Sequence, residues 1–190
     1  MLSVEDLTVK YGSFTALDAI SFDVDGGQWL MVAGPNGAGK STIVSAVSQG
    51  VPYGGQIRFN GTDLSRMRSK LIARHIAILT QNHSVGYSFT VKEITMLGRY
   101  AYREAMSGFT KADEEAVQRA LEQTGMAEYA NKSVLALSGG ELQRVFLAQV
   151  FAQDPKLLIL DEPANHLDLI YQKQIFGIIK EWLCQEGRAV

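Results

Sequence analysis

The sequence has few of the features that would place it outside a reducing compartment or within a membrane. Its one cysteine, Cys184, cannot form a disulfide within the chain, which indicates a reducing compartment. No apolar run approaches the roughly 20 residues of a membrane-spanning helix. The N-terminal residues do not have the pattern of a signal peptide. Any role at a membrane is therefore expected to be that of a peripheral protein on its cytoplasmic face.

The chain also lacks a large excess of charge of either sign, because 18 Lys and Arg residues and 20 Asp and Glu residues give a formal net charge of −2. This balance gives no reason to expect a nucleic-acid partner. Hydrophobic residues make up 46% of the chain and charged residues 20%, as in globular domains. No internal repeat is visible, and 190 residues suit one domain with a sizeable core. We expect residues 1–190 to form a single domain.

The most informative stretch is a glycine-rich turn between an apolar run and a potential helix. It fits the phosphate-loop pattern G-x-x-x-x-G-K-[ST] in its strand–loop–helix setting. Glycines allow successive backbone N–H groups to converge, and the helix start adds further donors. The Lys side chain can reach the β- and γ-phosphates, and the Ser hydroxyl can ligate Mg²⁺. We call this the phosphate loop; its residues are Gly34, Pro35, Asn36, Gly37, Ala38, Gly39, Lys40, Ser41 and Thr42.

Polar residues follow two further expected strands, and ligands of open α/β sheets gather at such carboxyl ends. Gln81 follows the strand at 75–80, and Asp161 and Glu162 follow the strand at 156–160. Asp161 suits a magnesium ligand, and Glu162 suits a general base for an attacking water. Gln81 is expected to orient that water and to contact Mg²⁺. Taken alone, these residues would be ordinary solvated turn residues; the phosphate loop makes the catalytic interpretation the better one.

The rest of the chain gives an α/β pattern around these strands. Residues 2–9, 17–24 and 28–33 are expected to be strands, with a further short strand at 55–61, which predicts a small antiparallel sheet beside the phosphate loop. Residues 82–135 contain helical patterns at 91–100 and 111–124, which indicate a helical insert. A helix begins at Ser138, another runs from about residue 168 to 183, and Ala189-Val190 begin a further strand.

Two other features allow two interpretations each. Tyr11, after the first strand, either stacks on an adenine ring or is an ordinary half-exposed tyrosine. Ser138 and Glu141 fit a capping box, which any helix can use. However, Gly139 and Gly140 lie between these two residues, and each glycine weakens a helix by about 1 kcal/mol relative to alanine. Close approach of a phosphate to this helix start would explain them, and the nucleotide concerned would be held by another copy.

Together these residues resemble the ATP-binding-cassette (ABC) ATPases over essentially the whole chain. The resemblance is carried by the phosphate loop, Gln81, the run Leu137-Ser-Gly-Gly-Glu-Leu-Gln143, and Leu157-Leu-Ile-Leu-Asp-Glu-Pro163. It implies a P-loop NTPase fold with a mixed core sheet, an N-terminal antiparallel β subdomain and a helical insert. It also implies ATP and Mg²⁺ as ligands and a head-to-tail pair, either a homodimer or two paired ATPase subunits. Each ATP would contact one phosphate loop and the partner's signature segment, defined as residues 138–141.

The resemblance also assigns roles to single residues. Tyr11 resembles the adenine-stacking tyrosine, Gln81 the Q-loop glutamine, Asp161 the Walker B aspartate and Glu162 the catalytic base. Residues 165–168, which end at Asp168 and include His166, resemble the loop through which paired subunits communicate. Residues 90–100 and 168–172 further resemble importers of iron chelates, haem and cobalamin, whose membrane permease subunits dock beside the insert. Val85, Tyr87 and Phe89 either line that groove or pack within the insert.

The sequence departs from the family at its end. Members carry a further strand and a switch histidine beyond Glu162, and neither His75, His83 nor His166 matches that position. We expect a C-terminally truncated domain with a gap between residues 28–33 and the strand at 156–160. It should bind ATP weakly and hydrolyse it poorly. The alternatives to an importer ATPase are a soluble ABC ATPase that acts on ribosomes and a nucleotide-binding fragment without turnover.

Overall fold

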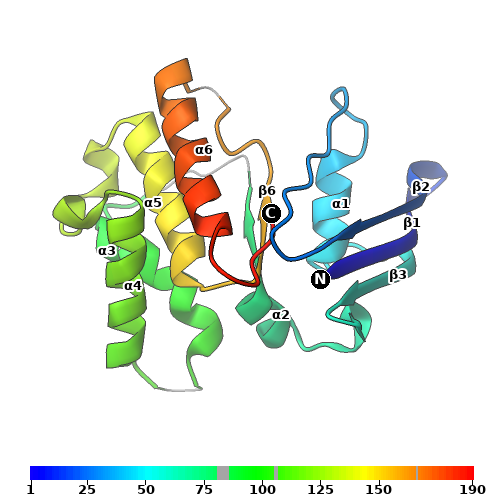
Figure 1. Cartoon of the computed structure of the whole chain (residues 1–190), viewed down its shortest axis with the longest axis horizontal. Helices are drawn as coiled ribbons and strands as arrows, with labels where there is room; N and C mark the ends of the chain where they lie inside the picture. Colours follow the sequence, from blue (N-terminus) through cyan, green and yellow to red (C-terminus); the bar gives the residue numbers. More distant parts are fainter. Residues whose placement is uncertain (81–85, 105–106, 166) are drawn as a thin grey trace.

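The computed structural model describes residues 1–80, 86–104, 107–165 and 167–190. Its elements form two bodies on either side of a short parallel strand pair (Figure 1). The elements are β1 (Leu2–Tyr11), β2 (Phe14–Val24), α1 (Lys40–Val47), β3 (Gly54–Phe59), β4 (Thr62–Asp63), α2 (Ser69–His75), β5 (Ile76–Leu79), α3 (Val91–Met96), α4 (Lys111–Gln123), α5 (Gly139–Ala152), β6 (Leu157–Leu160) and α6 (Leu169–Leu183). Short 3-10 helices lie at Leu64–Arg66, Leu97–Tyr102, Ala127–Tyr129 and Val134–Ala136.

The first body is a four-stranded antiparallel sheet of order β2-β1-β3-β4, covered by α1. Leu2 and Val4 of β1 are buried, and a register shift between Val4 and Leu7 returns Leu7 and Val9 to the same core. They pack with Ala46 and Val47 of α1 in one apolar cluster. The strands predicted at 2–9, 17–24 and 55–61 are thus confirmed as parts of an antiparallel sheet, which supports the helix that follows the phosphate loop.

The second body consists of α3, α4, α5 and α6, which pack on the parallel pair β5-β6. Ala77 and Leu79 of β5 belong to this helical cluster, whereas Ile76 belongs to the cluster of the antiparallel sheet. Successive strand residues point to opposite faces, so β5 and β6 join the two cores. A strand covered on both faces needs a continuous apolar run, which explains the sequence Leu157–Leu160.

The strand expected at 28–33 is not formed. Gln28 and Leu30 exchange backbone hydrogen bonds with Val190, at 3.0 and 2.8 Å. Among the described residues, no backbone hydrogen bond links Met31–Ala33 to β6, so this segment has no ladder that would make it a strand. Ala189 forms an isolated parallel bridge with Leu157, as the first residues of a further strand would.

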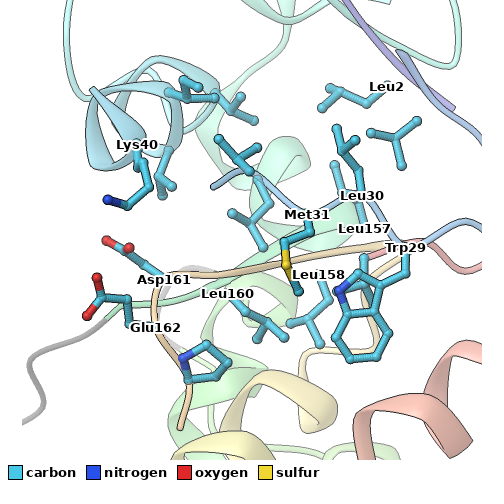
Figure 2. A pocket seen from close by; sticks show the side chains of 18 of the residues that line it. Leu2, Trp29, Leu30, Met31, Lys40, Leu157, Leu158, Leu160, Asp161 and Glu162 are labelled. Carbon is cyan, nitrogen blue, oxygen red and sulfur yellow. The ribbon is translucent and has the colours of Figure 1, made fainter. Parts of the chain in front are cut away.

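An apolar cavity of about 380 Å³ lies between Trp29–Val32 and β6. Figure 2 shows Trp29, Leu30 and Met31 lining it together with the β6 residues Leu157, Leu158 and Leu160. Met31 is 74% exposed although it lies within the apolar run Trp29–Ala33. The cavity lies where the sequence analysis expects a gap in the core.

Candidate functional site

The phosphate loop takes the conformation that its glycines allow. Gly37 and Gly39 have φ values of 82° and 88°, in the left-handed region that favours glycine. A Cβ atom on Gly39 would lie 2.6 Å from Leu17 Cδ2 and 2.8 Å from the carbonyl oxygen of Ala16. Gly39 is therefore needed both for the turn and for close approach to β2. Lys40 begins α1 directly afterwards, so unpaired N–H groups of this helix point toward the loop.

The polar side chains at the start of α1 reach two other parts of the site. Lys40 Nζ donates to the carbonyl oxygens of Gly34 and Pro35, at 2.8 and 3.0 Å, which holds its ammonium across the loop. Ser41 Oγ donates to Asp161 Oδ2 at 2.9 Å. Figure 2 shows Lys40, Asp161 and Glu162 together at one end of the cavity. The structure therefore brings together residues that lie 120 positions apart.

Hydrogen bonds within the loop after β6 and to β5 define its conformation. The N–H of Asp161 donates to the carbonyl oxygen of Leu79 at 2.8 Å, which fixes the end of β6 to β5. Glu162 follows with φ 52°, a left-handed value that is unusual for a side chain other than glycine. Asn165 Nδ2 donates to Glu162 Oε2 at 2.7 Å. The carboxylate is thereby held near Asp161 while its residue remains exposed.

The donor set fits Mg²⁺. Ser41 offers a hydroxyl oxygen and Asp161 a carboxylate oxygen, the oxygen ligands that Mg²⁺ prefers. Within the described parts of the chain, no group of three or more His, Cys, Asp or Glu side chains converges on a metal site. Mg²⁺ commonly combines one or two protein ligands with phosphate oxygens and waters. The pair therefore suits a metal that arrives with a nucleotide. Gln81, the third expected metal ligand, lies outside the described residues.

The signature segment forms the capping box expected from its sequence. Ser138 Oγ accepts from the N–H of Glu141 at 3.3 Å, and Glu141 Oε2 accepts from the N–H of Ser138 at 2.7 Å. The backbone and hydroxyl donors of Ser138 lower the pKa of Glu141. A Cβ on Gly140 would lie 2.7 Å from the ring of Tyr171, whereas a Cβ on Gly139 would meet nothing within 4 Å. Contacts within the chain thus account for Gly140 but not for Gly139.

Two other predicted site residues lie at exposed positions. Tyr11 ends β1, is half-exposed and pairs in register with Phe14. Asp168 Oδ1 accepts from the N–H groups of Ile170 and Tyr171, both at 3.0 Å, and so caps α6. The nucleotide roles of Tyr11 and Asp168 stay predictions. His166, in the same loop as Asp168, lies outside the described residues.

A second hollow, of about 430 Å³, lies beside the helical insert and is lined by Tyr87, Phe89, Leu97 and Phe146, among others. Tyr87 is 76% exposed, and its ring meets that of Phe89 edge-on at 6.3 Å. Both expected groove residues that the structure describes therefore line a hollow and contact each other. Val85, the third, lies outside the described residues.

A phosphate loop that opens a helix beside an acid at the end of a parallel strand defines a nucleotide-binding α/β domain. A family model described as ABC transporter matches residues 17–165. The chain therefore belongs to the ABC transporter family, as one of its ATP-binding domains. Among the described residues, no helix is both long enough and apolar enough to cross a bilayer.

Among the relatives that are similar to this chain are import ATP-binding proteins. The iron(3+)-hydroxamate import ATP-binding protein FhuC of Bacillus subtilis is 36% identical over all of this chain and 71% of its own length. The hemin import ATP-binding protein HmuV of Chelativorans sp. is 35% identical over all of this chain and 74% of its own. A solved structure of an ABC transporter proposed to be of the metal-chelate type, in an inward-facing conformation, has a TM-score of 0.86 at 26% identity and covers 100% of this chain and 70% of that one.

These relatives confirm the family resemblance and the P-loop fold drawn from the sequence. They are longer than this chain, which spans only 43% of another ABC transporter ATP-binding protein, 38% identical to it. Sequence reasoning missed three side chains that organise the site. Gln143 and Gln172 donate to the loop after Glu162, and Tyr171 packs on Gly140. Only the positions of Gln143 and Gln172 within the motif-bearing segments hinted at a role.

Proposed function

We propose that this chain binds MgATP and hydrolyses it as the ATP-binding subunit of an importer. The contact between Ser41 and Asp161 carries this proposal, because it joins the start of the phosphate-binding helix to the acid at the end of β6. Backbone N–H groups of the phosphate loop hold the phosphates, and Lys40 contacts the β- and γ-phosphates. Tyr11 stacks on the adenine ring. Ser41, Asp161 and Gln81 would hold Mg²⁺, which would supply neutralisation of the phosphate charge.

Glu162 is assigned the role of general base in the hydrolysis of ATP. Its carboxylate takes a proton from a water that Gln81 orients, and the water oxygen attacks the γ-phosphorus while the bond to the bridging oxygen of ADP breaks. We also propose that the 190-residue chain turns over slowly by itself. The apolar cavity beside Trp29–Val32 leaves the segment that leads into the phosphate loop poorly packed, so the loop is less rigid.

The nucleotide is proposed to lie between two copies arranged head to tail. Figure 1 shows α1 and α5 on opposite sides of β6, so the two helices that begin at the phosphate loop and at the signature segment are separated within one chain. Gly139 has open space where a Cβ would lie, as close approach of a phosphate from another copy requires. Ser138, Gly140, Glu141 and Asp168 are assigned to the same interface.

The partner of this pair is proposed to be an integral-membrane permease, with the chain as a peripheral protein on the cytoplasmic face. The hollow lined by Tyr87 and Phe89 supports this, because exposed aromatic side chains around a concavity favour a protein contact. The cargo is proposed to be an iron chelate, haem or cobalamin. The names of FhuC and HmuV support the first two.

A binding assay with a fluorescent ATP analogue tests the nucleotide site. Lys40→Ala should weaken Mg²⁺-dependent binding at least tenfold, because it removes the cation of the phosphate loop. Lys173→Ala, an exposed lysine of α6, is the matched control and should bind as the unaltered chain does. Equal affinities of Lys40→Ala and the control would refute the proposed site.

Light scattering tests the paired arrangement. Glu162→Gln keeps the shape of the side chain but removes the base, so a MgATP-bound dimer should accumulate. A protein that binds MgATP and stays monomeric throughout would contradict the head-to-tail pair while leaving the nucleotide site intact.

A further inference from the structure

The loop after Glu162 is held by two glutamines from different helices. Gln143 Nε2, on α5, donates to the carbonyl oxygen of Pro163 at 2.6 Å. Gln172 Nε2, on α6, donates to the carbonyl oxygens of Ala164 and Leu167, at 3.3 and 3.0 Å. Both side chains are partly buried, where a hydrogen bond suffers less competition from water than at the surface. Three carbonyl groups of this short loop are therefore fixed from outside it.

The residue that this arrangement restrains is Glu162. Its left-handed backbone, with φ 52°, costs roughly 1–2 kcal/mol for a residue with a Cβ. Such a conformation persists only where the surrounding structure over-determines it. On the N-terminal side, the hydrogen bond from Asp161 to β5 supplies this restraint. On the C-terminal side, Asn165 donates to the carbonyl and carboxylate oxygens of Glu162. Gln143 and Gln172 fix the loop that carries Asn165.

We propose that Gln143 and Gln172 are positioning residues that set the direction of the Glu162 carboxylate. The proposal rests on the proposed role of Glu162 as general base. A base must lie within hydrogen-bond reach of the water it deprotonates, and displacement by about 1 Å can cost a hundredfold in rate. The two glutamines act on the chemical step through the loop backbone and have no assigned contact with nucleotide.

The position of Gln143 adds a second consequence. It lies about one turn after the capped start of α5, on the same helix as the signature segment. A helix moves as a stiff unit, so a shift at Ser138–Glu141 is passed to the carbonyl oxygen of Pro163. Contact of a second copy with the signature segment would thus also adjust the loop beside Glu162 in the same chain.

Replacement by methionine tests the proposal, since methionine is close to glutamine in length and lacks the N–H donors. Gln143→Met, Gln172→Met and their combination are compared with Gln174→Met, an exposed glutamine on the same helix as Gln172. The measured quantities are the dissociation constant for MgATP, the single-turnover rate of hydrolysis at saturating MgATP, and amide hydrogen exchange of Ala164, Asn165, Leu167 and Asp168 without nucleotide.

The double variant should hydrolyse ATP at least tenfold more slowly than the Gln174→Met control, with the dissociation constant for MgATP changed less than twofold. Exchange of the loop amides should rise at least tenfold, while the cores of α5 and α6 exchange as in the control. A loop that exchanges at the control rate would overturn the proposal, as would unchanged hydrolysis.

The two proposals fail in different ways. Absence of MgATP binding by the unaltered chain would refute the proposed function. The exchange comparison needs no nucleotide, so it still decides whether the glutamines hold the loop. A loss of MgATP affinity in the double variant equal to its loss of rate would overturn the positioning role, because a positioning residue affects the chemical step and not binding.

Discussion

The two glycines of the signature segment should respond in opposite ways to a single methyl group. Gly139 and Gly140 are neighbours in the first turn of α5. A Cβ on Gly139 meets nothing within 4 Å, whereas a Cβ on Gly140 lies 2.7 Å from Tyr171 Cδ1 and 3.0 Å from two further ring atoms. The pair Gly139→Ala and Gly140→Ala therefore separates a structural requirement from a functional one.

The magnitudes follow from helix propensity and packing. Gly139→Ala should raise the free energy of unfolding by up to about 1 kcal/mol, because alanine loses less backbone entropy than glycine in a helix. Gly140→Ala has the same gain but forces the Tyr171 ring to move, and such overpacking costs about 1–3 kcal/mol. Gly140→Ala should therefore be about 1–3 kcal/mol less stable than Gly139→Ala.

Urea unfolding followed by tryptophan fluorescence measures both variants, and the double variant with Tyr171→Ala measures the contact. The penalty of Gly140→Ala should shrink when the ring is absent, as expected for residues in direct contact. In the presence of MgATP, Gly139→Ala should dimerise less than the unaltered chain although it is not less stable. If Gly140→Ala is as stable as Gly139→Ala, the packing argument is wrong. If Gly139→Ala is destabilised, its role is structural.

Other predictions concern the helical insert and the metal. Arg99→Met should lower the free energy of unfolding, measured in urea, by about 3 kcal/mol. Arg99 Nε lies 2.8 Å from the carboxylate of Asp113, whose side chain is only 6% exposed, so the substitution leaves a buried charge without its partner. A loss below about 1 kcal/mol would refute this. Burial raises the pKa of Asp113, but hydrogen bonds from Thr110 and Arg99 outweigh it and hold that pKa below its ordinary value. The stability that this lowered pKa contributes is present above the unfolded pKa of about 4 and is lost as pH falls through the folded pKa. In Asp113→Asn the free energy of unfolding should therefore fall less steeply at acid pH. An unchanged dependence of that free energy on pH, measured by urea unfolding, would contradict this. Asp161→Asn should weaken nucleotide binding at least tenfold with Mg²⁺ and leave binding in EDTA unchanged, as measured by titration; equal losses in both conditions would exclude a metal role.

Local patterns predicted most of the elements. The alternating apolar pairs of Leu2–Val9, separated by a register shift, and the apolar run Leu157–Leu160 predicted strands, because burial on one or both faces imposes such patterns. The capping box at Ser138 also formed as expected. The sequence analysis missed α2 and β4, which are short and have no periodicity that distinguishes them from a loop.

The strand predicted at residues 28–33 does not form, and the cause lies in the tertiary structure. Trp29–Ala33 has a strand-like composition, but a strand exists only where a neighbour completes its hydrogen-bond ladder. Within the described parts of the chain, its backbone finds a partner only around Val190. Composition alone contains no information on whether that neighbour is present.

The sequence by itself determined the chemical groups of the site: a turn that only glycines allow, a lysine and a serine at a helix start, and two carboxylates after an apolar strand. These depend on neighbours along the chain, so local spacing specifies them. Only the tertiary structure decided that Ser41 meets Asp161, that Tyr171 lies on Gly140, and that Gln143 and Gln172 hold the loop beside Glu162. Such contacts join distant segments, and their geometry depends on how whole helices and strands pack together.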